Sequence, residues 1–259
     1  MAPSSDEPTE RFTGLAKIYA RHRPSFPTEA IDFIVKKGSL VPGDVVADIG
    51  AGTGISSRLL ADRDIDVIAI EPNEEMLKQA RAVPNPRIRF RSARAEQTGL
   101  ASGSVKGIIS AQAFHWFDPE PTLAEFHRIL VAGGWVALLW NERDDSDPGT
   151  RAYSKVITSH REASIQEARR QRAALSLSQS RSFFDYTFRV YPHEQILSKE
   201  ELLGRAFSVS YAPLDERGRD AWRTGLEAVF DQYARDERFR LAYSTSVHFA
   251  RAPVSNDES

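Results

Sequence analysis

"VVADIGAGTGISSRLLADRDIDVIAIEPNEEML", residues 45–77, holds three glycines separated by single residues, with one acid before them and another after them. The apolar run 45–49 is typical of a buried strand, and helical spacing begins near residue 55. Glycine lets a strand turn sharply into a helix and lets a ligand approach the backbone closely, because no Cβ intervenes. The stretch therefore predicts a ligand-binding turn between a strand and a helix of an α/β sheet.

The spacing of these glycines separates two classes of cofactor. A dinucleotide site typically has G-x-G-x-x-G, but the residue three beyond Gly52 is Ile55, and the third glycine comes early, at Gly54. The carboxylate of Asp48 does not stabilise a bound diphosphate, which is also negative, whereas it attracts a cofactor that carries an amine and a sulfonium. Glu71 ends the next strand, where an acid either binds two ribose hydroxyls or caps a helix. A nicotinamide-dependent dehydrogenase is therefore the weaker alternative.

Apolar runs alternate with helical segments through the first half of the chain. Strands are predicted at VVADIG, DVIAIE, RIRF, VKGIISA and GGWVALLW, and helices at 55–61, 74–82 and 122–130. Asn73 is a candidate N-cap of the second helix. Thr122 and Glu125 have capping-box spacing in the third helix, which Gly133 and Gly134 would close. Apolar strands separated by helices indicate a parallel sheet covered on both faces.

The second half has a weaker pattern. Residues 144–182 are polar and rich in arginine, which indicates either a solvated helix or a cover over the site. Beyond them we predict a strand at YTFRVY, helices at 199–206 and 215–236, and a last strand at LAYSTSVHFA. Because there is no internal repeat and no strong linker, residues 1–259 are expected to form a single domain.

Composition excludes several classes of protein. The 259 residues are 41% hydrophobic with a formal net charge of −2, which predicts a full core and no general affinity for nucleic acid or membranes. The absence of cysteine excludes disulfides and thiolate metal sites, and the histidines lack metal-binding spacing, so no metal is predicted. The start MAPSSDEPTERF has no signal-peptide pattern and WVALLW is too short to span a bilayer. We expect a soluble cytoplasmic protein.

The motifs VADIGAGTG, IEPNEEML, ARAEQTGL, AQAFHWFD and LVAGGWVALLWNERD resemble those of class I S-adenosylmethionine-dependent methyltransferases. Within them, the chain is similar to the small-molecule type 11 group that includes trans-aconitate methyltransferase-like proteins. The resemblance implies a Rossmann-like, doubly wound α/β fold with a seven-stranded, mostly parallel sheet whose last strand is antiparallel. It also implies a cover segment at 1–43, a cofactor-binding half at 44–141 and a substrate-side half at 142–250.

The same resemblance implies which residues bind S-adenosylmethionine. They are Asp48, Gly50, Gly52, Thr53 and Gly54 at the turn, Glu71, Pro72, Asn73 and Met76 after the second strand, Ala95 and Glu96 after the third, and Gln112 after the fourth. Glu71 would hold the ribose, and Gln112 would lie beside the reactive end. Tyr19 and Arg23 would close over the cofactor and pair with its carboxylate.

The expected chemistry is an in-line displacement on a methyl carbon that the sulfonium already activates, so positioning and exclusion of water supply much of the catalysis. His115 is a candidate base if the acceptor must lose a proton, the alternative being a structural or substrate-contact role. Trp116 is expected in the wall of the substrate site. Arg143 either clamps an acceptor carboxylate or forms a surface ion pair with Glu142 or Asp144.

The expected function is therefore methyl transfer to an oxygen, nitrogen or carboxylate of a small molecule. The alternative is a protein that binds S-adenosylmethionine without methyl transfer, either an accessory or regulatory protein or an enzyme of the same fold with another reaction. The acids at Asp48 and Glu71 and the complete loop after the fourth strand favour an enzyme. No motif specifies the acceptor or the oligomeric state.

Overall fold

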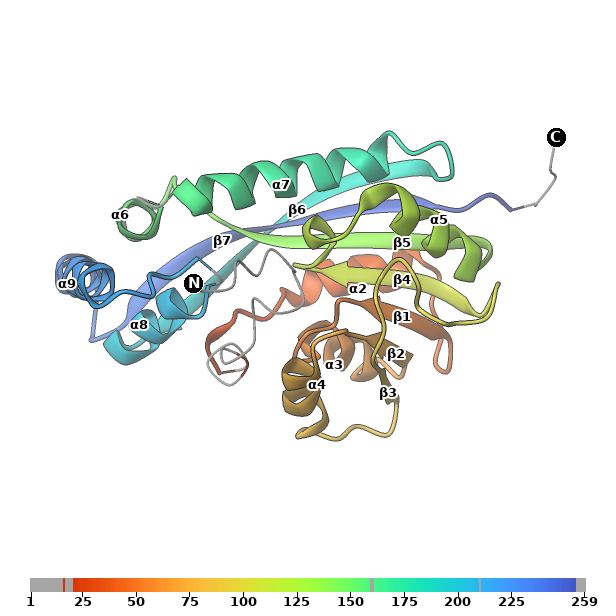
Figure 1. The fold of residues 1–259 in the computed structure, drawn as a ribbon, viewed down its shortest axis with the longest axis horizontal. Helices are drawn as coiled ribbons and strands as arrows, with labels where there is room; N and C mark the ends of the chain where they lie inside the picture. Colours follow the sequence, from red (N-terminus) through yellow and green to blue (C-terminus); the bar gives the residue numbers. More distant parts are fainter. Residues whose placement is uncertain (1–15, 17–20, 159–160, 210, 255–259) are drawn as a thin grey trace, which may run out of the picture.

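A seven-stranded sheet runs through the computed structural model, which describes residues 16, 21–158, 161–209 and 211–254 (Figure 1). Its strands are β1 (Val45–Ile49), β2 (Asp66–Ile70), β3 (Ile88–Arg91), β4 (Val105–Ala111), β5 (Leu130–Arg143), β6 (Phe184–Leu197) and β7 (Phe239–Arg251). The order is β3-β2-β1-β4-β5-β7-β6. The strands from β3 to β5 pair in parallel, and β7 pairs antiparallel with β5 and β6. The predicted α/β fold with a mostly parallel sheet is confirmed.

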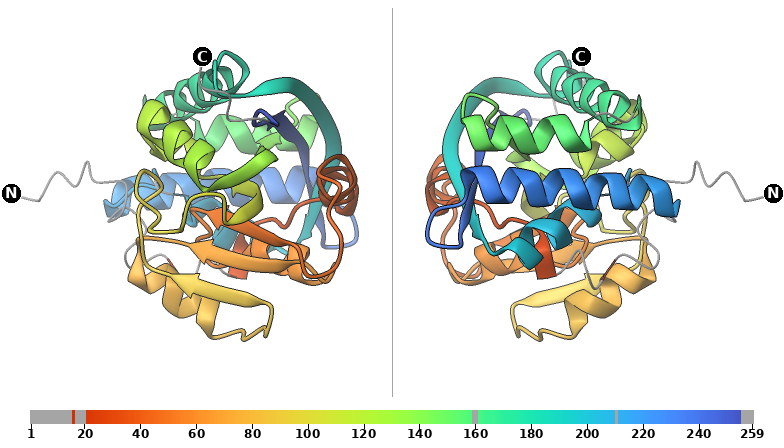
Figure 2. Two further views of the ribbon diagram at one scale, coloured as in Figure 1. Left: turned by 90° about the vertical axis from the view of Figure 1, so that its right-hand side faces the viewer. Right: turned by 90° about the vertical axis from the view of Figure 1, so that its left-hand side faces the viewer.

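Helices cover both faces of the sheet and one of its ends (Figures 1 and 2). One face carries α2 (Thr28–Lys37), α3 (Ile55–Ala61) and α4 (Glu74–Arg81), and the other carries α5 (Pro119–Ile129) and α7 (Arg161–Ser178). At one end lie α6 (Pro148–Ile157), α8 (Lys199–Phe207) and α9 (Glu216–Tyr233). Each group of helices encloses its own cluster of buried apolar side chains. The sheet thus supplies one rigid base for both halves of the chain.

The helices that follow β1 and β2 begin where the sequence predicts. The first occupies Ile55–Ala61 and the second Glu74–Arg81, within a residue of the expected bounds. Asn73 caps the second helix, because its side chain accepts a hydrogen bond from the Met76 backbone N–H at 3.0 Å. A short polar side chain at this position satisfies a donor that has no partner inside the helix. Local chemistry alone thus sets both helix starts.

The predicted capping box in α5 is not formed. The helix begins one turn earlier, at Pro119, whose fixed φ and missing N–H suit the first helical position. Thr122 therefore lies inside the helix, and the side chain of the N-cap residue Asp118 makes no capping hydrogen bond. The helix ends at Ile129, so Gly133 and Gly134 do not close it and instead belong to β5.

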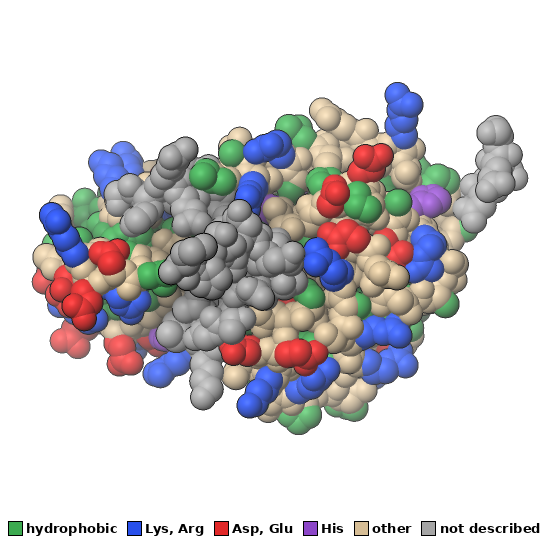
Figure 3. All heavy atoms as spheres, in the orientation of Figure 1, with side chains coloured by type: hydrophobic (Ala, Val, Ile, Leu, Met, Phe, Trp, Pro, Cys, Tyr) green, Lys and Arg blue, Asp and Glu red, His purple; other side chains and the backbone are tan. Residues whose placement is uncertain are grey.

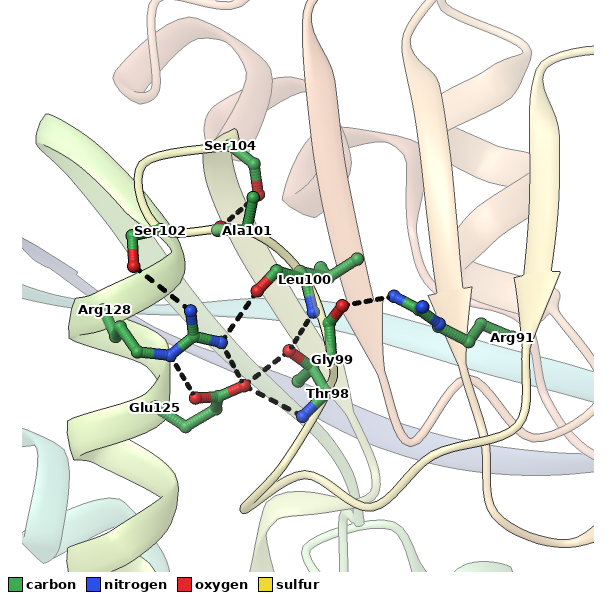
Figure 4. A network of polar contacts seen from close by, with 9 residues as sticks. All are labelled: Arg91, Thr98, Gly99, Leu100, Ala101, Ser102, Ser104, Glu125 and Arg128. Carbon is green, nitrogen blue, oxygen red and sulfur yellow. Dashed lines mark hydrogen bonds and ion pairs between the residues drawn. The ribbon is translucent and has the colours of Figure 1, made fainter.

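Glu125 instead ties α5 to the loop that follows β3 (Figure 4). Its Oε1 accepts hydrogen bonds from the backbone N–H of Thr98 at 2.8 Å and from the Thr98 hydroxyl at 2.6 Å. Arg128 donates to Oε2 at 2.7 Å. Burial would raise the pKa of Glu125, but the donors Arg128 and Thr98 outweigh it and lower the pKa. The loop carrying Ala95 and Glu96 is thereby held against a helix.

The arginine-rich stretch is mostly helical, with α6 at one end of the sheet and α7 on the face that also carries α5. It includes all of α6 and all of α7, and the α7 side chains Ala173 and Leu177 are buried. The Arg169 guanidinium lies over the Trp116 ring, 6.0 Å from its centroid. Because α7 contacts the short helix after β4, it is more than a solvated helix, and its role as a cover over the site stays a prediction.

The outer surface mixes charges of both signs. Lysine and arginine side chains lie among aspartates and glutamates over the described part of the face in Figure 3. Among the residues that the structure describes, no helix combines the length and the apolar character needed to cross a membrane. The mixed surface agrees with the nearly neutral composition.

Candidate functional site

The three glycines of the turn all adopt left-handed backbone, with φ of +73° at Gly50, +56° at Gly52 and +79° at Gly54. Side chains with a Cβ adopt this conformation only at a cost. A Cβ at Gly50 would lie 2.4 Å from that of Ala113, so this glycine also permits close packing against the loop after β4. A Cβ at Gly52 would meet nothing within 4 Å. The turn therefore presents bare backbone at Gly52 to open space.

Glu71 joins this turn to the end of β2. Its Oε2 accepts from the Gly52 backbone N–H and its Oε1 from the Asn73 backbone N–H, both at 2.9 Å. Burial raises the pKa of Glu71, and these two hydrogen bonds only partly oppose that effect. Each carboxylate oxygen retains a lone pair. The carboxylate is thus fixed in place and can still accept hydrogen bonds from a ligand.

Asp48 lies behind the turn. Its Oδ2 accepts hydrogen bonds from the hydroxyls of Ser56 at 2.7 Å and Ser57 at 2.6 Å, while its Oδ1 has no partner. Burial raises the pKa of Asp48 to about 6, against the opposing hydrogen bonds from Ser57 and Ser56. Alternation along β1 directs the side chain toward α3, on the same face as Val46. Asp48 is thus absent from the described lining of the pocket, and any effect on a ligand is electrostatic.

A pocket that is partly open to solvent lies over the turn. The predicted cofactor residues that line it are Arg23, Gly50, Gly52, Thr53, Glu71, Pro72, Asn73, Met76, Ala95, Glu96 and Gln112, and the predicted substrate residue Trp116 lines it too. Gly54 is outside the lining described, and Tyr19 lies outside the described residues.

Several lining residues were not predicted. Pro24 and Phe26 come from the segment before α2, and Phe117 follows the short helix η1 (Phe114–Trp116). No sequence motif marks these apolar side chains, because a residue in the wall of a pocket needs only a suitable size. Arg94 also lines the pocket, and its Nε lies 3.6 Å from the Glu96 carboxylate. The flanking residues Ala93 and Ala95 do not distinguish Arg94 from an ordinary surface arginine.

Gln112, at the end of β4, combines strain with a hydrogen-bond network. Its φ is +58°, which is unfavourable for a residue other than glycine and is typical of functional positions. Its Nε2 donates to the Asn141 carbonyl at 3.1 Å, and Asn141 donates to the Ser25 carbonyl at 2.9 Å. The Thr245 hydroxyl donates to Asn141 at 2.6 Å. The network joins the ends of β4 and β5 and the middle of β7 to the segment before α2.

His115 presents a hydrogen-bond donor. Its Nδ1 accepts a hydrogen bond from the Trp140 indole N–H at 3.2 Å. Burial lowers the pKa of His115 well below its usual value, and the neighbouring Arg170, Arg23 and Arg169 act in the same direction. The imidazole is therefore neutral, and with Nδ1 accepting, its one proton lies on Nε2. His115 is not among the described residues that line the cofactor pocket.

Arg143 does not form the surface ion pair that was one of its two predicted roles. Its Nε donates to the Ser154 hydroxyl at 2.9 Å, and the Tyr211 phenol lies beside the guanidinium. In the described chain it lies outside the lining of the cofactor pocket, in the space between β5 and α6. The ion pair is thus absent among the described residues, and the role of Arg143 as a clamp for an acceptor carboxylate stays a prediction.

Comparisons with known proteins identify a domain within this structure. Residues 47–138 match the family described as a methyltransferase domain. An uncharacterized methyltransferase of Mycobacterium tuberculosis is 38% identical over 146 residues, which are 56% of this chain and 58% of that protein. The chain thus spans less than two thirds of that relative. An uncharacterized methyltransferase-like protein of Schizosaccharomyces pombe is 28% identical over 88% of this chain and 90% of its own length.

Solved structures share the whole architecture. A protein from Anaeromyxobacter dehalogenans, described as a type II methyltransferase, has a TM-score of 0.64 at 22% identity over 89% of this chain and 99% of its own. Phosphoethanolamine N-methyltransferase 2 of Haemonchus contortus, solved with S-adenosyl-L-methionine, has a TM-score of 0.53 at 16% identity over 96% of this chain and 59% of its own. The match identifies a methyltransferase domain at residues 47–138, and the solved structures share the class I methyltransferase fold with this chain.

Proposed function

We propose that the protein transfers the methyl group of S-adenosylmethionine to an oxygen, nitrogen or carboxylate of a small molecule. One observation carries the proposal: the Glu71 carboxylate is fixed by the Gly52 N–H at the edge of a pocket into which Gly52 presents bare backbone. The motifs quoted above further suggest membership of the small-molecule type 11 group, with trans-aconitate methyltransferase-like proteins.

The residues around the pocket fit this cofactor. Glu71 would accept hydrogen bonds from the ribose hydroxyls with the lone pairs that the backbone leaves free. Asn73 and Met76 would pack near the adenine, as would the loop that Glu125 holds against α5. The buried charge of Asp48 would favour the positive end of the cofactor. Arg23, which lines the pocket, would pair with its carboxylate.

Positioning and exclusion of water would supply most of the catalysis. Bound S-adenosylmethionine supplies a methyl carbon that its sulfonium activates for in-line attack. Trp116 and Phe117 line the pocket beside Gln112 and would keep water from the reacting atoms. His115 would hold the acceptor by donating from Nε2, because its Nδ1 is occupied by Trp140. An acceptor that arrives deprotonated needs no base, and attack proceeds once it is aligned.

Methyl transfer is tested with S-adenosylmethionine labelled in its methyl group, added to the purified protein and a cell extract. We expect label in the small-molecule fraction. The variant Glu71→Gln places an amide N–H against one of two backbone donors, so we expect it to lose transfer and cofactor affinity together. Glu74→Gln, at an exposed position on the following helix, is the matched control.

Two outcomes would contradict the proposal. Label that enters only macromolecules would mean that the acceptor is not a small molecule. Absence of transfer, with tight binding of S-adenosylhomocysteine shown by calorimetry, would favour the alternative of a protein that binds the cofactor for regulation or for another reaction.

A further inference from the structure

Two arginines far apart in the sequence lie together at the end of the sheet that α6 and α8 cover. Arg143 ends β5, and Arg205 lies on α8 with only 5% of its surface exposed. Tyr153 of α6, Tyr243 of β7 and Tyr211, all buried, complete the cluster. Arg143 pairs in register with Tyr243, whose hydroxyl accepts a hydrogen bond from Arg205 Nε at 3.1 Å, so one tyrosine connects the two arginines.

The groups that contact these arginines are neutral. Arg143 donates from Nε to the Ser154 hydroxyl at 2.9 Å. Arg205 donates from Nε to the Tyr243 hydroxyl at 3.1 Å and from Nη1 to the Ser208 hydroxyl at 3.4 Å. Throughout the described ranges, no aspartate or glutamate carboxylate lies within 4.0 Å of either guanidinium, whereas Arg240 in the same half has two such partners.

Arg205 is buried and Arg143 is half-buried, and two such cations without a carboxylate partner among the described residues are an unfavourable arrangement. Burial opposes the charge of both arginines, but neighbouring tyrosine oxygens outweigh it and raise the pKa of each, so both stay charged. A buried charge without a counter-charge costs several kcal/mol, and the repulsion between two of them adds to that cost. Natural folds retain such a cost where a ligand relieves it.

The Tyr153 hydroxyl is an independent observation at the same place. The side chain is 0% exposed and its hydroxyl has no hydrogen-bond partner among the residues that the structure describes, although it lies in the field of both arginines. A buried hydroxyl without a partner costs about 1–3 kcal/mol. An oxyanion between the arginines would accept from this hydroxyl and from both guanidinium groups, so a single ligand would satisfy all three.

The cluster is connected to the cofactor pocket. Arg23, which lines that pocket, donates to the Ser208 carbonyl at 3.3 Å, and the Ser208 hydroxyl accepts from Arg205. From the other side, Gln112 lines the pocket and donates to Asn141, two positions before Arg143 on β5. A group held by the two arginines would therefore lie on the substrate side, next to the reactive end of the pocket.

We propose that Arg143, Arg205 and Tyr153 bind an anionic group of the methyl acceptor, either a carboxylate or a phosphate. The proposal deepens the methyl transfer proposed above and rests on it. Bidentate guanidinium contacts suit both kinds of oxyanion. The acceptor thus enters already charged, which agrees with a His115 that donates a hydrogen bond and takes no proton.

The test measures binding of defined anions to the full chain saturated with S-adenosylhomocysteine. The probes are succinate, glutarate, inorganic phosphate and, as a neutral match, dimethyl glutarate, each followed by melting temperature and calorimetry. We expect a dicarboxylate or phosphate to raise the melting temperature saturably and the ester to have no effect. The anion that binds more tightly identifies the group as carboxylate or phosphate.

Variants separate the site from general charge effects. Arg143→Gln should weaken binding of the anion at least about tenfold, since it removes a charged hydrogen-bond donor. Arg240→Gln, with its arginine paired to Glu194 at 2.7 Å and Asp147 at 3.0 Å, should leave binding unchanged. Tyr153→Phe should have an equal or higher melting temperature, because it removes a buried hydroxyl that has no partner among the described residues. The same variant should still bind the anion more weakly.

Three results would overturn the anion site. The first is equal stabilisation of the protein by the neutral ester and by the anions. The second is an equal loss of anion affinity in Arg143→Gln and Arg240→Gln. The third is unchanged anion affinity in both single variants, Tyr153→Phe and Arg143→Gln. Binding of S-adenosylhomocysteine is measured in the same experiments. If the parent protein does not bind S-adenosylhomocysteine, the proposed function is contradicted. If it binds S-adenosylhomocysteine but no anion, only the anion site is contradicted.

Discussion

Gly50 and Gly52 share a left-handed backbone but have different surroundings. An alanine at either position pays for a strained φ, about 1–2 kcal/mol. At Gly50 the new Cβ also meets Ala113 at 2.4 Å, whereas at Gly52 it enters the open space of the pocket. One glycine is therefore needed for the fold, and the other is expected to be needed for the ligand.

We predict that Gly52→Ala loses affinity for S-adenosylhomocysteine at least about tenfold with a modest loss of stability, because the Cβ occupies ligand space. Gly50→Ala should lose more of its free energy of unfolding, because the steric conflict adds to the backbone strain. Urea denaturation and calorimetry on both variants check this. Equal losses of affinity and of stability in the two would contradict the distinction.

The buried carboxyl of Asp48 makes stability depend on pH. Burial raises its pKa from 3.8 to about 6, so the folded state binds this proton more tightly than the unfolded state does. The resulting stabilisation is complete below pH 3.8 and is lost as the pH rises through about 6. The difference amounts to about 3 kcal/mol, at 1.36 kcal/mol per pKa unit.

We predict that Asp48→Asn, whose amide oxygen can still accept from Ser56 and Ser57, removes this pH-dependent contribution. The gain in the free energy of unfolding over the parent should be larger at about pH 7.5 than at about pH 4.5. Urea titrations at the two pH values measure it, with Asp62→Asn at an exposed position as control. Parallel pH profiles for parent and Asp48→Asn would contradict the prediction.

Among the helices, α5 matters for the site because of the loop that it holds. Glu125 accepts two hydrogen bonds from Thr98 and is paired with Arg128 (Figure 4). Glu125→Gln weakens these contacts, and we predict a loss of about 1–3 kcal/mol in the free energy of unfolding. Cofactor affinity should fall as well, because Ala95 and Glu96 lie on the loop.

Urea denaturation and calorimetry measure these two effects, with Glu120→Gln at an exposed position of the same helix as control. A change of stability without any change of cofactor affinity would show that the loop does not depend on this contact. The role of Glu125 was hidden in the sequence, because its spacing from Thr122 matches a capping box equally well. Pro119, which sets the start of the helix, decided against that pattern.

One sheet links the glycine turn, where the cofactor is proposed to bind, to the cluster around Arg143. Ligands that bind only the folded state raise its stability by mass action, about 2.7 kcal/mol at a hundredfold excess over Kd. We predict that S-adenosylhomocysteine raises the melting temperature in this way, whereas NADH at the same concentration does not. A comparable shift with NADH would favour the dinucleotide alternative that Ile55 and Asp48 argue against.

The sequence by itself determined the α/β class, the positions of the parallel strands and the starts of α3 and α4. These features depend on local periodicity, glycine at the turn and the cap at Asn73. Most of the residues around the pocket were implied by the resemblance of the sequence motifs to a known family, and they lie directly after the strands of a parallel sheet, whose ends meet at one edge.

Only the tertiary structure decided which side chains meet across the sheet. It directed Asp48 behind the turn, placed Trp140 against Nδ1 of His115 and brought Arg205 beside Arg143. Trp140 meets His115 because β4 and β5 pair side by side. Arg205 meets the β5 end through the packing of α8 and the antiparallel pairing of β7. Periodicity records which face of an element is buried, but a contact between elements depends on their relative placement, which no local pattern contains.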